Sequence, residues 1–193
     1  MNSGTLFYVV GASGAGKDSL MNFARKNLSV KHVKFAIRHI TRPADAGGEA
    51  HIATSHEEFQ QLMEQSFFSL FWESHGNRYG ISKEINQWLN DGINVVVNGS
   101  RGYLPTALSR YPNLKTVLIE VSEHVMRKRL TGRGRESNEE IEDRIKRSKT
   151  FQNFDVPGMV RINNDRALEL SGAEFVSVIS ALPREKNAFI STA

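Results

Sequence analysis

Hydrophobic residues gather in six short runs along the chain, and stretches with helical spacing separate them. The runs cover residues 5–10, 32–37, 67–72, 93–98, 114–121 and 159–163. Strand-like runs that alternate with amphipathic helices are typical of an α/β fold, in which helices cover both faces of a mainly parallel sheet. A chain of 193 residues with this alternation predicts one compact domain.

Polar residues mark where several of the helices begin. Ser55 with Glu58, and Ser137 with Glu140, have the spacing of capping boxes, and Ser122 is a candidate N-cap. We therefore expect helices to start at these three places.

Composition and charge narrow the range of partners. The 25 Lys and Arg residues exceed the 21 Asp and Glu residues, and the formal net charge of +4 suits an anionic ligand. No aromatic and basic motif indicates nucleic acid, and no apolar run approaches the ~20 residues of a membrane span. Residues 1–4 lack the features of a signal peptide, and the absence of Cys agrees with a reducing compartment. We expect a cytoplasmic protein without nucleic-acid or membrane partners, and the oligomeric state stays open.

A glycine-rich segment follows the first apolar run directly and carries the strongest chemical signal. Its nine residues are Gly11, Ala12, Ser13, Gly14, Ala15, Gly16, Lys17, Asp18 and Ser19. The glycines let backbone N–H groups converge on a triphosphate, and Lys17 supplies a cation to the β- and γ-phosphates. A helix expected over residues 17–27 points its positive N-terminus at the same anion. With a strand before and a helix after, the segment predicts an ATP-binding phosphate loop rather than a flexible turn.

One position of this loop departs from the usual pattern. A Ser or Thr that holds Mg²⁺ normally follows the loop lysine, but here the residue is Asp18. A carboxylate beside a triphosphate is repelled unless a cation lies between them, so we interpret Asp18 as a Mg²⁺ ligand, direct or through water. The alternative is that Asp18 only favours the helix N-terminus, while Ser19 provides the hydroxyl ligand.

Two further segments place cations beside turn residues. Arg38 and Arg42 lie within the segment R-H-I-T-R-P and have the guanidinium geometry to clamp a phosphoryl group; an exposed basic loop is the alternative. Residues 76–82 contain one cation, Arg78, and one phenol, Tyr79. This second segment would suit a plain loop equally well when it is considered alone.

Basic residues also concentrate in residues 127–136. Arg129 and Arg133 are i,i+4 partners on one helical face, an unfavourable placement unless an anion lies between them. Gly132 and Gly134 are expected to break the helix and form a hinge. The combination predicts a mobile lid that brings arginines to a transferring phosphoryl group and expels water. A solvated charged face or a nucleic-acid patch is the alternative.

Six motifs in fixed order resemble the guanylate-kinase-like branch of the nucleoside monophosphate kinases over nearly the whole chain. They are GASGAGKDS, RHITRP, GNRYGIS, RLTGRGRES, IEDRIKRS and RINND. The resemblance implies a P-loop kinase fold with one domain over residues 1–182 and a tail over 183–193. Within the domain it implies an acceptor-binding insert at about 36–82 and a lid at about 129–148.

The resemblance also implies roles for individual residues. Arg144 falls at the position of a lid arginine and joins the two arginines named above. Asn163 and Asp165 fall where the family contacts adenine, and His51 falls near a tyrosine that contacts the acceptor phosphate. Members of the family also carry a carboxylate near the end of the strand over 93–98, where this chain has Asn98. The metal carboxylate is therefore interpreted as moved to the phosphate loop.

Other departures from the guanylate kinase sequence concern the substrate that accepts the phosphoryl group. Guanylate kinases read guanine with a Glu at the position of Leu70, and a buried isobutyl group leaves the base edge unrecognised. The strings GKDS, TRP, VVVNGSR, RGRE and NND are instead similar to the ribose 1,5-bisphosphate phosphokinases of phosphonate degradation. This resemblance implies that ATP and Mg²⁺ serve to phosphorylate the 1-phosphate of a sugar bisphosphate, giving 5-phosphoribosyl 1-diphosphate (PRPP). Arg78 and His39 are candidates for binding its second phosphate.

The chemistry of such an acceptor needs little from the protein beyond positioning. A phosphate monoester with a second pKa of ~6 is largely dianionic at neutral pH, so no general base is required. Catalysis then depends on alignment and charge neutralisation by Lys17, Arg129, Arg133 and Arg144. Two alternatives remain: a nucleoside monophosphate kinase such as guanylate kinase, and a non-catalytic module that binds phosphorylated protein segments. The second predicts a degraded phosphate loop, whereas the loop glycines and lysine are intact.

Overall fold

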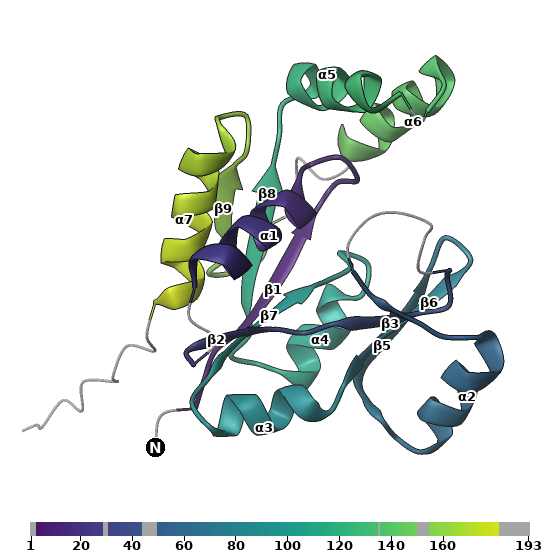
Figure 1. Cartoon of the computed structure of the whole chain (residues 1–193), viewed down its shortest axis with the longest axis vertical. Helices are drawn as coiled ribbons and strands as arrows, with labels where there is room; N and C mark the ends of the chain where they lie inside the picture. Colours follow the sequence, from purple (N-terminus) through teal and green to yellow (C-terminus); the bar gives the residue numbers. More distant parts are fainter. Residues whose placement is uncertain (1–2, 29–30, 44–49, 135, 150–154, 182–193) are drawn as a thin grey trace, which may run out of the picture.

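A five-stranded parallel sheet forms the centre of the molecule (Figure 1). The computed structural model describes residues 3–28, 31–43, 50–134, 136–149 and 155–181, so the tail expected at 183–193 lies outside the described residues. The strand order is β2-β7-β1-β8-β9. The strands are β1 (Leu6–Gly11), β2 (Val33–Phe35), β7 (Asn94–Asn98), β8 (Lys115–Glu120) and β9 (Val160–Asn163). Each coincides with one of the apolar runs, which confirms the predicted parallel sheet.

A second, four-stranded sheet stands beside the first, with the order β4-β3-β6-β5. Its strands are β3 (Arg38–Ile40), β4 (Ile52–Ala53), β5 (Phe68–Ser74) and β6 (Asn77–Ser82). β6 runs antiparallel to both β3 and β5. The apolar run at 67–72 therefore belongs to this sheet, and its assignment to the alternating parallel pattern is wrong. The reason is the two-residue turn at His75 and Gly76, whose positive φ angles of 50° and 72° suit a tight antiparallel hairpin.

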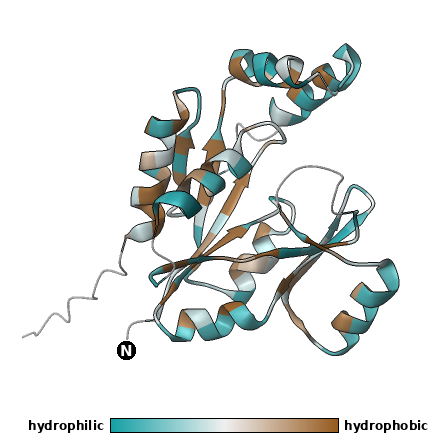
Figure 2. Ribbon diagram, in the orientation of Figure 1, coloured by the Kyte–Doolittle hydropathy of each residue, from teal (hydrophilic) through white to brown (hydrophobic). Residues whose placement is uncertain are grey.

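Helices cover both faces of the parallel sheet, as predicted. α1 (Lys17–Asn27) and α7 (Leu168–Ser180) pack on one face around Phe7, Val9 and Phe175. α3 (Glu84–Asn90) and α4 (Leu104–Arg110) pack on the other face around Tyr8. α2 (His56–Glu64) contributes Phe59, which stacks on Phe68 of the second sheet. Figure 2 shows the resulting concentration of hydrophobic residues along the central strands and of polar residues on outward faces. No helix within the described ranges is long and apolar enough to span a membrane.

The predicted helix starts are confirmed by their cap hydrogen bonds. Ser55 Oγ accepts from the Glu58 backbone N–H at 3.0 Å, and the Ser55 N–H donates to Glu58 Oε2 at 2.7 Å. Ser137 and Glu140 make the same reciprocal pair at 3.2 and 2.8 Å. Ser122 caps the following helix through the Val125 N–H. Local sequence thus determines these boundaries.

Two helices, α5 (Glu123–Arg133) and α6 (Asn138–Lys149), form a hairpin beyond the carboxyl end of β8 (Figure 1). Apolar contacts join them through Met126, Leu130, Ile141 and Ile145. Gly134 ends α5 with φ 62°, but Gly132 lies inside the helix, so the prediction that both glycines break it is wrong for Gly132. A helix interior accepts glycine when neighbouring side chains are held by tertiary packing, because the propensity cost is only about 1 kcal/mol.

Candidate active site

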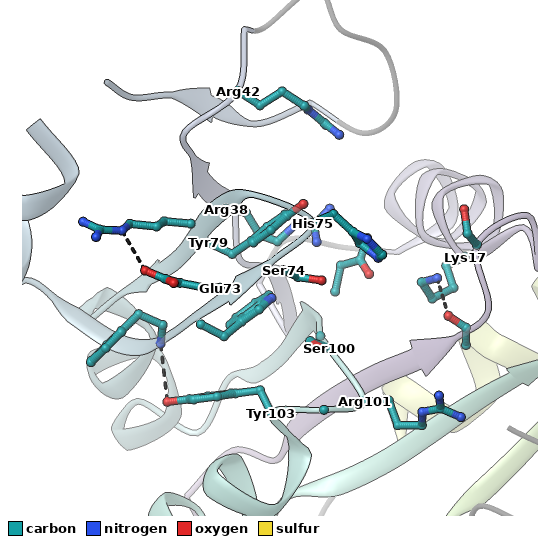
Figure 3. Close-up of a pocket in the computed structure, with 18 of the residues that line it drawn as sticks. Lys17, Arg38, Arg42, Glu73, Ser74, His75, Tyr79, Ser100, Arg101 and Tyr103 are labelled. Atoms are coloured by element: carbon teal, nitrogen blue, oxygen red, sulfur yellow. Dashed lines mark hydrogen bonds and ion pairs between the residues drawn. The ribbon is translucent and has the colours of Figure 1, made fainter. Parts of the chain in front are cut away.

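A cleft of about 850 Å³ separates the carboxyl ends of β1 and β7 from the second sheet (Figure 3). It gathers residues predicted to bind ATP and residues predicted to bind the acceptor. Those that line it are Gly11, Ser13, Lys17, Asp18, Arg38, Arg42, Arg78 and Tyr79. The phosphate loop and the predicted acceptor residues therefore face one common space. This is the edge of an open α/β sheet at which ligands bind.

The phosphate loop wraps around the amino end of α1. Lys17 opens the helix, and its Nζ donates to the carbonyl oxygens of Gly11 at 2.8 Å and Ala12 at 3.2 Å. Gly16 has φ 86°, a left-handed conformation that favours glycine. The lysine therefore reaches back across the loop and lines the cleft.

Asp18 contacts the end of a neighbouring strand. The Asn98 side-chain Nδ2 donates to Asp18 Oδ1 at 3.1 Å, and both residues line the cleft. Asn98 is 3% exposed at the end of β7. The two positions that depart together from the guanylate kinase pattern are thus in direct contact, and the amide orients the carboxylate.

Aromatic rings build the wall opposite the phosphate loop. Tyr79 and Trp72 stack with ring centroids 5.5 Å apart and planes 1° apart, and Trp72 stacks in turn on Tyr103. The Arg38 guanidinium lies 5.3 Å from the Tyr79 ring centroid, at cation–π distance. The row of rings fixes the direction of this arginine before any ligand binds.

Other predicted acceptor residues differ in how they face the cleft. Arg78 lines it but pairs with Glu73 at 2.9 Å and with Gln60 at 3.1 Å, so a carboxylate accompanies this cation. His51 Nε2 lies 3.2 Å from the Arg42 carbonyl oxygen, and His51 is not among the residues that line the cleft.

His39 does not fit the predicted role in binding a second phosphate. Its ring meets the rings of Phe67 and Phe68 edge-on, with centroids 5.4 and 5.5 Å away, and it does not line the cleft. Burial lowers the pKa of His39, which favours the neutral ring. This prediction is wrong because alternate strand residues face opposite sides, and Arg38 takes the side of the cleft.

Two of the three predicted lid arginines contact the region of the phosphate loop. Arg144 Nη1 donates to Ser13 Oγ at 2.7 Å, and its Nη2 pairs with Glu136 at 3.0 Å. Arg129 Nη2 donates to the backbone oxygen of Asn164 at 2.7 Å. Arg133 is exposed in the last turn of α5 and makes no contact with the loop within the described ranges.

The loop after β9 holds the predicted adenine contacts. Asn163 Oδ1 accepts from the Asp165 N–H at 2.8 Å, and Asp165 Oδ1 accepts from the Ser122 N–H at 2.7 Å. These two side chains therefore shape the turn. The residue between them, Asn164, points inward and donates through Nδ2 to the Ala15 carbonyl oxygen at 2.7 Å.

The loop after β7 contributes an arginine to which the sequence analysis assigned no role. Arg101 lines the cleft beside Ser100, and partial burial lowers its pKa (Figure 3). Tyr8 makes two hydrogen bonds to the backbone of this loop. Its hydroxyl accepts from the Ser100 N–H at 2.9 Å and donates to the Ser100 oxygen at 3.1 Å. A Cβ on Gly99 would lie 2.2 Å from the Tyr8 ring. The signal that could have found Arg101 is its position just past a buried strand, at the sheet edge that binds ligands.

Comparison with known proteins identifies the family and the fold. The guanylate kinase family model matches residues 3–167, and the chain belongs to this family. The ribose 1,5-bisphosphate phosphokinase PhnN of Thiobacillus denitrificans is 46% identical over 98% of this chain and 100% of its own length. The protein of the same name from Desulfomicrobium baculatum is 50% identical over 90% of this chain and 93% of its own. A crystal structure of guanylate kinase from Anaplasma phagocytophilum shares the fold, with a TM-score of 0.66 at 16% identity over 92% of this chain and 85% of that one.

Proposed function

We propose that this protein transfers a phosphoryl group from ATP to the 1-phosphate of ribose 1,5-bisphosphate, giving 5-phosphoribosyl 1-diphosphate and ADP. The relatives named above carry this activity in their names. The observation that carries the proposal is the shared cleft, in which the phosphate loop faces a wall that carries Arg38 and Arg42. A small phosphorylated sugar and ATP as substrates agree with the cytoplasmic location expected from the sequence.

The position that guanylate kinases use to read guanine is apolar here. Leu70 is 0% exposed and belongs to the core cluster that also contains Trp72 and Ile81. Leu70 does not line the cleft and offers a guanine base no hydrogen-bond acceptor, and each base group left unpaired in a buried site would cost about 1–3 kcal/mol. Trp72 and Tyr79 stack on each other in this wall, and Arg38 and Arg42 would bind the phosphate of a small acceptor beside them.

The arrangement supports direct in-line transfer without a general base, because the attacking oxygen belongs to a dianionic phosphate. Arg38 and Arg42 lie on the acceptor side, where they would orient this phosphate. Lys17 lies on the donor side and would bind the β- and γ-phosphates. Arg144, which already contacts the loop through Ser13, would neutralise charge on the transferring group. Proximity and electrostatic stabilisation are then the protein's main contributions.

The residues present fit a Mg²⁺ ion that arrives with the nucleotide. Within the described part of the chain, no group of three or more His, Cys, Asp or Glu residues could hold a metal alone. Mg²⁺ bound to nucleotide phosphates keeps several waters and needs only one or two protein ligands. Asp18, oriented by Asn98 at the cleft, and Ser19 would supply them. When bound, the ion neutralises phosphate charge.

The metal role of Asp18 predicts a shifted Mg²⁺ requirement. Asp18→Asn is expected to raise the Mg²⁺ concentration needed for half-maximal activity by about tenfold, because it removes a negative charge while keeping size and polarity. Asp18→Ser should recover part of the affinity by providing a hydroxyl. The measurement is a Mg²⁺ titration of the initial rate at fixed ATP, which also gives the half-maximal Mg²⁺ concentration for each variant.

Asp143→Asn on the exposed side of α6 is the matched control for this titration and should leave the curve unchanged. If Asp18→Asn also leaves it unchanged, Asp18 serves only the start of α1.

The acceptor is tested directly by a substrate panel. Transfer from ATP is measured to ribose 1,5-bisphosphate, GMP, AMP and ribose 5-phosphate, and we expect kcat/KM for the bisphosphate to exceed the others by at least about 100-fold, since missing hydrogen bonds discriminate strongly. A higher kcat/KM for GMP would identify a nucleoside monophosphate kinase instead. Failure to bind or turn over ATP at all would identify a non-catalytic module.

A further inference from the structure

Asn164 joins three separate parts of the kinase core. Its backbone N–H donates to the Glu120 oxygen at the end of β8 at 2.8 Å. Its side-chain Nδ2 donates to Ala15 O in the phosphate loop at 2.7 Å, and its backbone oxygen accepts from Arg129 Nη2 at 2.7 Å. The residue is only 2% exposed. A buried amide with these partners links the sheet edge, the phosphate loop and helix α5.

The same contacts bring the Arg129 guanidinium to the phosphate loop. A Cβ built on Gly16 would lie 2.4 Å from Asn164 Nδ2 and 3.5 Å from Arg129 Nη1. Arg129 Nη1 and Asn164 Oδ1 are both buried and have no hydrogen-bond partner among the described residues. A buried guanidinium nitrogen without an acceptor is costly, and such cost is tolerated where a ligand supplies the acceptor. The edge of Arg129 that carries this nitrogen lies against the backbone that would cradle a phosphate.

We infer that Asn164 is a positioning residue that acts through Arg129, and this inference rests on the proposed kinase function. The backbone oxygen of Asn164 holds one guanidinium nitrogen, which leaves Nη1 directed at the phosphate loop for a nucleotide phosphate oxygen. Its side-chain amide anchors residue 164 to the Ala15 carbonyl, and this anchor keeps the backbone oxygen where it accepts from Arg129. Asn164→Ala keeps that oxygen but removes its anchor. Fixing the long arginine side chain beforehand removes an entropy cost from binding and transfer.

A double-mutant cycle tests this dependence. Asn164→Ala, Arg129→Ala and the double variant are compared with the wild type for kcat/KM of ATP at saturating acceptor. We expect Asn164→Ala to lower kcat/KM by about 10- to 100-fold, the scale of a small misplacement in an active site. The double variant should fall within about threefold of Arg129→Ala alone, because residues in one network are not additive. Losses that simply multiply would overturn the inference.

Asn94 provides a matched control for a purely structural effect. It is also a buried amide, 4% exposed, and its Nδ2 donates to the backbone oxygens of Ile179 and Ala181 at the amino end of the sheet. Asn94→Ala and Asn164→Ala should lower the melting temperature by similar amounts, but only Asn164→Ala should lower kcat/KM. Equal kinetic losses in both would assign Asn164 to the fold alone. If Asn164→Ala does not fold, Asn164→Ser enters the cycle in its place.

Calorimetric binding of ATP separates this inference from the proposed function. If the wild type does not act on ribose 1,5-bisphosphate, the proposed acceptor is wrong. The cycle is then read from the ATP dissociation constants, which do not depend on the acceptor. We expect Asn164→Ala to weaken ATP binding about tenfold and to have no further effect in the Arg129→Ala background; an equal loss in both backgrounds would overturn the inference.

Discussion

Lys17→Ala is expected to abolish phosphoryl transfer, with kcat lowered by at least about three orders of magnitude. The variant removes the one lysine of the phosphate loop, whose Nζ lies across the loop at hydrogen-bond distance from Gly11 and Ala12. The loop's other residues are small or acidic, so none of them offers a second cation. The initial rate at saturating ATP and acceptor provides the measurement.

Lys26→Ala is the matched control, since Lys26 is exposed in the last turn of the same helix. It should keep wild-type kinetics, and both variants should unfold at temperatures close to the wild type. Retention of more than about a tenth of the activity by Lys17→Ala would show that the loop does not serve as the phosphate site.

Arg144→Ala is expected to lower kcat by about 10³-fold, the lower end of the effect of an arginine that stabilises a phosphoryl-transfer transition state. One end of its guanidinium contacts Ser13, and the other is held by Glu136. In the proposed mechanism this delocalised cation would neutralise the charge that develops on the transferring group. Arg144→Lys should recover only part of the loss, because an ammonium group cannot make both contacts at once. Single-turnover rates at saturating ATP separate this effect from binding.

Arg147 on the same helix serves as the comparison. It is exposed, and its Nε donates to the Asp143 oxygen one turn earlier in α6. Arg147→Ala should change kcat by less than threefold. A similar loss in both variants would mean that α6 contributes only its overall charge.

The elements that the sequence predicts well are those determined by contiguous residues. The phosphate loop, α1 and the capped starts of α2, α5 and α6 each depend on a few neighbouring positions. β3 and β6 were not predicted because they carry Arg38, His39 and Arg78 in place of an apolar run. Their strand conformation comes from pairing with each other across a sequence gap, with Arg38 opposite Ile81. Propensity gives little information where distant partners decide the structure.

Some features of the candidate site could likewise be predicted from contiguous residues, whereas others depend on tertiary contacts. Motifs located the loop after β9, but which of its polar side chains turns inward depends on tertiary contacts, and that residue is Asn164 rather than Asn163 or Asp165. The interior position of Gly132 likewise follows from helix packing and not from its intrinsic propensity. The role of Arg101 could not be separated from an exposed arginine until the cleft was formed around it.

The place of β1 at the middle of the parallel sheet has a consequence for the synthesis of the chain. Of the five strands, β1 is synthesised first, but its two partners in the sheet are β7 and β8. Leu6 cannot pair until Val95 has been synthesised, and Phe7 cannot pair with Lys115 until still later. The acceptor-side sheet uses only strands between residues 38 and 82 and is complete earlier. A nascent chain stalled before residue 115 therefore exposes one open edge of an apolar strand, and such edges promote association with other chains.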